Sequence, residues 1–211
     1  MQTSINLLKQ FGNITEPSEK IVELIKTQIG AVENSRNIEN DYNDIVVAEI
    51  VEKENHPDSD KLGIYQINHG EDETIQVVAG DRTLNVGDKV AYLKPGATVP
   101  YSISSQAEPL VIKEIKLRGV MSNGMLASER ELNISNKHEN VFKLPSDAPI
   151  GVNLSEYFEL NDTVVDIENK ALTNRGDLFS IIGLSRELTA ITGNRFESPD
   201  WYRSPNTNLK V

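Results

Sequence analysis

The chain has 211 residues, with 21 basic and 32 acidic side chains, a formal net charge of -11 and no cysteine. The length allows one large domain or two small ones, and 38% hydrophobic with 25% charged residues is typical of a globular protein with a buried core. Lack of cysteine excludes disulfides and thiolate metal sites, and the acidic charge argues against broad, non-specific nucleic-acid binding. Neither a long apolar run nor a leader-like N-terminus occurs, so we expect no membrane span, no signal peptide and a cytoplasmic location.

The first part of the chain is predicted to form a strand and then a helix. Residues 3–12 are short and apolar, which favours a strand. Residues 16–34 carry apolar side chains at helical spacing, which predicts a helix. The polar run that follows, 34–44, is typical of a turn.

In the middle of the chain the hydrophobic period changes from that of a helix to that of strands. Five short apolar or alternating runs are separated by stretches rich in Gly, Pro, Asn and Asp, and this spacing indicates a small barrel or sandwich. The predicted strands are 44–54, 62–68, 74–80, 88–96 and 110–119. The whole middle segment holds eleven basic and seventeen acidic residues, so the predicted barrel is not basic overall.

The last part of the chain returns to a mixed pattern. Residues 162–169 are strand-like, and residues 174–196 form an amphipathic helix that Asn174 or Asp177 can cap and Gly193 can end. The Arg-Gly-Asp tripeptide at its start is short enough to arise by chance, so we favour helix capping over an adhesion motif.

The changes of pattern predict four segments along the chain. They are the first half of an α+β domain (1–43), an inserted barrel (44–155), the second half of the α+β domain (156–196) and a linker (197–211).

The sequence offers no complete catalytic constellation. No nucleophile elbow, Walker loop or Rossmann glycine spacing occurs. The run from His56 to Asp60 contains metal-binding residue types, but a turn stiffened by Pro57 and bonded by its Asp and Ser side chains is favoured. The chain has three histidines, and we expect His56, His69 and His138 all to be exposed in polar loops.

A basic strand end offers a candidate binding surface. Lys116 and Arg118 share one face by alternation, and Lys61 and Arg130 flank other predicted barrel turns. Together with the small polar side chains of Ser122 and Asn123, these cations could line a groove for a phosphodiester backbone. A solvated strand edge, where lysine prevents aggregation, explains the same residues equally well.

Several motifs resemble a known family. "HPDSDKL", "QVVAG" and "LRGVMSNGMLASEREL" resemble the oligonucleotide-binding (OB) fold tRNA-binding domain, which occurs in several synthetases and in free-standing proteins. "SINLLKQF" and "NRGDLFSIIGLSRELTAITG" resemble the two halves of the first domain of the bacterial phenylalanine–tRNA ligase β subunit. In that family the OB domain is inserted into the first domain, which implies an α+β chain with a five-stranded OB-fold β-barrel inserted into a split small α+β domain.

The resemblance also implies a function. The whole enzyme is an α2β2 class II synthetase that attaches phenylalanine to its tRNA using ATP and Mg²⁺, with catalysis on the α subunit and editing in later β domains. The chain would then be an N-terminal fragment with no catalytic residue, metal site or cofactor of its own. Its partners would be tRNA and the α subunit.

Within this family, the expected RNA-binding residues cluster around the predicted barrel turns. Cations would contact phosphates, Ser122 and Asn123 would add polar contacts, and Gly124 would permit a tight turn. Asp81 is expected to place a negative charge near the same surface. Two alternatives remain: a structural or domain-docking module with little RNA binding, and a free-standing tRNA-binding protein. The full expected set is Lys61, Arg82, Lys116, Arg118, Ser122, Asn123 and Arg130.

Overall fold

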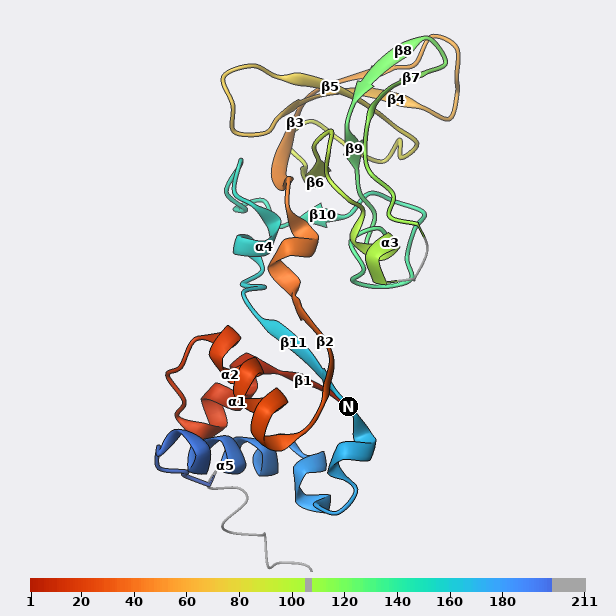
Figure 1. The fold of residues 1–211 in the computed structure, drawn as a ribbon. Helices are drawn as coiled ribbons and strands as arrows, with labels where there is room; N and C mark the ends of the chain where they lie inside the picture. Colours follow the sequence, from red (N-terminus) through yellow and green to blue (C-terminus); the bar gives the residue numbers. More distant parts are fainter. Residues whose placement is uncertain (105–107, 199–211) are drawn as a thin grey trace, which may run out of the picture. The chain divides into compact units, whose positions relative to one another are not determined.

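The computed structural model describes residues 1–104 and 108–198, which form two compact units (Figure 1). The first unit joins Met1–Ile38 to the segment that begins at Asp162, and the second is the continuous stretch Glu39–Asn161. One unit is therefore inserted into the other along the chain. From residue 199 onward, the predicted linker (197–211) lies outside the described residues.

The first unit is a three-stranded antiparallel sheet packed against helices. Strand β11 lies in the centre of the sheet, between β1 and β2. Apolar side chains from the sheet, from the helices and from a 3-10 turn form one core, and its fully buried members are Ile5, Leu8, Ile21, Ile25, Val165, Ile167, Leu172, Leu184 and Leu188. The elements are β1 (Gln2–Ser4), α1 (Ile5–Gly12), α2 (Ser18–Leu24) with a π-helical turn (Ile25–Ile29), β2 (Val32–Asn37), β11 (Thr163–Ile167), 3-10 turns at Asn169–Leu172 and Gly176–Phe179, and α5 (Ile181–Thr192).

The start of this unit differs from the prediction. Only β1 is extended, and the predicted strand over residues 3–12 is wrong because the chain turns into helix α1 at Ile5. The Ser4 side chain accepts a hydrogen bond from the Leu7 N–H and caps the helix, and Asn13, with φ of 51°, ends it. Strand β2 occupies residues that the sequence predicted as helix end and turn.

Helix α5 is present but begins later than predicted. Ser180, and not Asn174 or Asp177, caps it by accepting a hydrogen bond from the Gly183 N–H. Gly193 ends the helix in the left-handed conformation, as predicted, with φ of 74°. Among the described residues, none of the helices is long and apolar enough to cross a membrane.

The second unit is a nearly closed antiparallel barrel. Its main sheet has the order β10-β6-β3-β4-β5, and β9 pairs with β6. The interior is filled by side chains that alternate along these strands, including Ala48, Ile50, Tyr65, Ile67, Val77, Val90 and Tyr92. The elements are a 3-10 turn at Ile38–Tyr42, β3 (Ile45–Asn55), β4 (Gly63–Asn68), β5 (Ile75–Ala79), β6 (Lys89–Leu93), α3 (Pro100–Ser104), β9 (Met125–Leu126), β10 (Lys143–Leu144) and α4 (Leu154–Tyr157).

A hairpin of β7 (Glu114–Leu117) and β8 (Val120–Asn123) packs against β5. The buried Ser122 hydroxyl accepts a hydrogen bond from the Val78 N–H at 3.0 Å, and Gln76 Nε2 donates to the Met121 carbonyl at 2.7 Å. Of the strand predicted over 110–119, only Glu114–Leu117 forms a strand, which is β7 of the hairpin. The predicted fold class is confirmed: the chain is α+β, with an OB-like five-stranded barrel inserted into a split unit.

Candidate nucleic-acid interface

The turn between β3 and β4 is organised by a buried histidine. The Asp58 N–H donates to His56 Nδ1 at 3.1 Å, so the ring proton lies on Nε2, which donates to the Leu117 carbonyl at 3.0 Å. Both ring nitrogens thus form hydrogen bonds within the protein, which agrees with the prediction that residues 56–60 form a turn. Among residues 1–104 and 108–198, no group of three or more metal-ligating side chains comes together.

Contrary to the prediction of exposure, two of the three histidines are buried. His56 and His69 are only 4% and 6% exposed, and the His69 ring lies 5.7 Å from the ring of Tyr92. Their neighbours in the sequence are polar, so the sequence did not indicate that the folded barrel buries both imidazole rings. Only His138 is in an exposed loop.

Two arginines converge on the carbonyls of this turn. Arg82 donates to the Asp60 carbonyl at 2.6 Å and to Asn55 Oδ1 at 2.9 Å. From the β7–β8 turn, Arg118 donates to the Asp58 carbonyl at 3.0 Å. Residues 36 positions apart in the sequence are thereby held at one end of the barrel.

Two lysines complete this group. Lys61 is exposed at the end of the same turn. Lys53, which the sequence analysis missed, donates to the carbonyls of Arg82 and Leu84 at 2.9 and 2.6 Å. It alternates with glutamates on β3 and so looked like part of a solvated strand. We call Lys53, Lys61, Arg82 and Arg118 together the basic turn.

Among residues 1–104 and 108–198, no carboxylate pairs with a cation of the basic turn. Elsewhere in the barrel unit, Lys89, Lys94, Lys137 and Lys143 each form an ion pair with a carboxylate within 4.0 Å. Within the part of the chain that the structure describes, the remaining basic residues of the unit form no such pair, and they are Lys53, Lys61, Arg82, Lys113, Lys116, Arg118 and Arg130. Their charge is therefore available to an external anion.

The other expected site residues are placed differently. Lys116 is exposed on β7, two residues from Arg118. Arg130 lies apart from the basic turn, with its guanidinium 4.9 Å from the centre of the Tyr101 ring. Ser122 is buried, and besides its bond from Val78 it donates to the Gly124 carbonyl at 3.0 Å, so its hydroxyl stabilises the hairpin. The half-buried Asn123 receives a hydrogen bond on its carbonyl from the Tyr92 hydroxyl at 2.7 Å.

Asp81 does not present its charge to solvent. Its buried carboxylate accepts hydrogen bonds from the N–H and hydroxyl of Thr83 at 2.8 and 2.7 Å, and from the Val141 N–H at 2.8 Å. Burial opposes ionisation, but these hydrogen bonds and the charge of Lys143 outweigh it and hold the pKa of Asp81 below its ordinary value. The carboxylate therefore serves the loop geometry.

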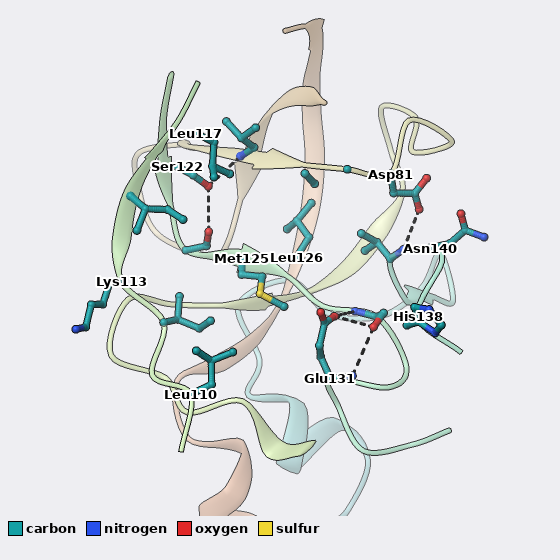
Figure 2. A pocket seen from close by; sticks show the side chains of 18 of the residues that line it. Asp81, Leu110, Lys113, Leu117, Ser122, Met125, Leu126, Glu131, His138 and Asn140 are labelled. Carbon is teal, nitrogen blue, oxygen red and sulfur yellow. Dashed lines mark hydrogen bonds between the residues drawn. The ribbon is translucent and has the colours of Figure 1, made fainter. Parts of the chain in front are cut away.

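A cavity of about 710 Å³ opens on one side of the barrel (Figure 2). It is bordered by the end of β5, the segment that leads into β7, the β8–β9 strands and the loop from His138 to Val141. Its wall is mostly aliphatic, and we call it the aliphatic groove. None of the four residues of the basic turn lines it, so the barrel has two distinct surface features.

Comparison with known proteins assigns the barrel unit to a protein family. A family model described as a putative tRNA binding domain matches residues 45–153, more than half of the chain. The chain belongs to this family. The matched residues include β3 to β9 and all four members of the basic turn.

The curated relatives of this tRNA-binding-domain protein extend the likeness to both units. Phenylalanine–tRNA ligase β subunits from Coxiella burnetii and Cupriavidus pinatubonensis are 36% and 38% identical, each over 95% of this chain and 24% of the relative. The β subunit from Fusobacterium nucleatum is 36% identical over 100% of this chain and 26% of the relative. The predicted resemblance is confirmed, and the chain spans about a quarter of the length of these relatives.

Among solved structures, the C-terminal domain of Plasmodium vivax p43 covers 52% of this chain and 57% of that one, at 24% sequence identity. Its TM-score of 0.35 is too low to carry an argument about shape.

Proposed function

We propose that the chain is the tRNA-binding module of a phenylalanine–tRNA ligase β subunit. The family model and the β-subunit relatives support this assignment. In the whole enzyme, phenylalanine would be attached to tRNA in the cytoplasm with ATP and Mg²⁺, and an α subunit would be a partner. The chain itself would be a non-catalytic N-terminal portion, and we assign none of its residues to ATP or to Mg²⁺.

The observation that carries the proposal is the basic turn. In a chain of net charge -11, binding to RNA phosphates requires local positive charge that no carboxylate neutralises. The basic turn supplies four such cations, and Lys116 lies two residues from it along β7. We propose that these residues contact phosphates, which position RNA without reading its sequence. Arg130, which lies apart, would make at most a peripheral contact.

A salt titration tests the proposal. Each phosphate contact contributes about -0.7 to -0.9 to the slope of log affinity against log salt. Changing Lys116→Gln together with Arg118→Gln should therefore make the slope of tRNA binding less negative by about 1.5. Between 50 and 200 mM salt, the wild type should lose roughly eight times more affinity than the double variant.

The matched control removes the same charge from elsewhere on the barrel unit. Lys94 and Lys137 both form ion pairs, with Glu71 and Glu129, so Lys94→Gln with Lys137→Gln should leave the slope close to that of the wild type. Equal slopes for the two double variants would show that the cations are wrongly assigned. Thermal unfolding of Arg118→Gln alone checks that loss of its bond to the Asp58 carbonyl leaves the fold intact.

The main alternative is a structural or domain-docking module. The acidic net charge favours it, because such a surface repels RNA outside the basic turn. Absence of a tRNA complex at 50 mM salt would reject the RNA-binding proposal and leave this alternative.

A further inference from the structure

Exposed aliphatic side chains gather on one wall of the aliphatic groove. Leu110, Val111 and Ile115 are 56%, 43% and 47% exposed, and all three line it. They come from the segment that leads into β7 and from β7 itself. Large aliphatic side chains held together at the surface indicate a binding site, whereas scattered ones need no explanation. The volume of about 710 Å³ lies in the range of ligand sites, about 300–1,000 Å³.

The lining of the groove does not suit RNA. Proteins that hold unpaired bases stack them on aromatic rings, but among the described residues that line the groove His138 is the only ring, and no Phe, Tyr or Trp is present. Among the described residues that line it, two carboxylates besides the internally bonded Asp81, those of Glu131 and Glu139, outnumber the single cation Lys113. A phosphodiester backbone would be repelled, whereas a cation next to an apolar group would be attracted.

Glu131 provides a fixed anchor for such a cation. One of its carboxylate oxygens, Oε2, accepts hydrogen bonds from the N–H and hydroxyl of Ser128 at 2.6 and 2.7 Å. Within residues 1–104 and 108–198, no hydrogen bond to the other oxygen, Oε1, is formed. Figure 2 shows the side chain of Glu131 extending toward Met125, at the aliphatic part of the groove. The carboxylate is thus oriented before any ligand arrives.

We propose that the aliphatic groove binds a segment of a partner polypeptide in which an aliphatic side chain adjoins a lysine or arginine. The aliphatic side chain packs against Leu110 and Ile115, and the cation pairs with Glu131. The site is separate from the basic turn, so the barrel holds RNA on one surface and a protein on another. A polypeptide matches both features of the lining because it can present an aliphatic side chain and a cationic side chain at neighbouring positions.

Synthetic peptides test the proposal directly. Three fluorescein-labelled twelve-residue peptides are compared by anisotropy: one alternates Leu with Arg, one alternates Leu with Glu, and one alternates Ser with Arg. Only the Leu–Arg peptide is expected to bind below 1 mM, because it alone offers both chemistries. Equal binding of the Ser–Arg peptide would indicate general attraction to an acidic protein and would overturn the proposal, as would no binding of any peptide.

Matched variants locate the site. Glu131→Gln keeps an acceptor for Ser128 but removes the charge, and it should weaken the Leu–Arg peptide about 10-fold. Glu73→Gln, an exposed carboxylate outside the groove, should not. Leu110→Ser should weaken binding by about 5-fold, and Val86→Ser, at 62% exposure outside the groove, should have no effect.

Two further measurements distinguish the aliphatic groove from the basic turn and from a surface for self-association. Neither Glu131→Gln nor Leu110→Ser should change tRNA affinity, so the groove and the basic turn can fail independently. Sedimentation of the wild type should show a monomer. A dimer that Leu110→Ser dissociates would mean that a second copy fills the groove, and it would overturn the assignment to a separate partner.

Discussion

Replacing Asp81 tests whether its carboxylate holds the wall of the barrel together. Asp81→Ala removes the acceptor of two backbone donors, the N–H groups of Thr83 and Val141. Hydrogen bonds to a charged group contribute about 1.5–3 kcal/mol each. Since Thr83 is exposed and can turn to water, we expect a loss of about 3 kcal/mol of unfolding free energy, the lower end of the simple sum.

The assay is urea unfolding followed by the amide signals of the barrel unit at pH 7. In a separate thermal unfolding experiment, the same loss of about 3 kcal/mol corresponds to a fall in Tm of roughly 9 °C for a chain of this size. Asp81→Asn keeps one carbonyl acceptor, so it should cost about half as much. A cost below about 1 kcal/mol for Asp81→Ala would refute the assignment.

The lowered pKa of Asp81 adds a dependence on pH. A carboxyl group whose pKa is lowered by folding stabilises the protein above its unfolded pKa of about 3.9, and this contribution is lost as pH falls through the folded value. The wild type should therefore lose more stability than Asp81→Asn on acidification. The same loss in both proteins would mean that the carboxylate is not held in its ionised form by folding.

Two more predictions concern backbone strain and an exposed ion-pair network. Gly124 has φ of 100°, and a Cβ there would collide with the Leu93 carbonyl oxygen, so Gly124→Ala should cost about 3 kcal/mol. Gly119→Ala, at φ of 88° but with open space around it, should cost only about 1 kcal/mol in the same urea assay. Hydrogen bonds from Arg175 lower the pKa of Asp177 to about 2, so its carboxyl carbon should titrate near that pH by NMR. Arg175→Ala should move this titration toward the ordinary value, and an unchanged midpoint would contradict the ion pair.

The strands of the barrel could be predicted because their apolar residues alternate or run together. Strand β2 could not, because it is mostly polar, has no buried residue and so carries no hydrophobic period. Helix α1 was mistaken for a strand because eight residues are too few to show a helical period clearly. The Ser4 cap was the available signal, and it precedes the apolar run as an N-cap does.

The candidate interface was only partly visible in the sequence. Lys116 and Arg118 could be found because they alternate on one strand. Their relation to Lys53 depends on barrel closure, which brings together turns that are far apart in the chain. Ser122 looked like a ligand contact because a small polar residue in a turn can serve either purpose, and only the hairpin's packing on β5 shows what its hydroxyl contacts.

Arg82 and Arg118 donate hydrogen bonds to backbone carbonyls, and these bonds affect both the rate and the free-energy cost of binding an anion. Immobilising a flexible side chain on binding costs about 0.5–1.5 kcal/mol. Both guanidinium groups are already restrained, so much of that cost is met during folding. Within the described part of the chain, neither guanidinium has an ion pair that must break before a phosphate approaches, so association can proceed at a rate set by diffusion and electrostatic steering.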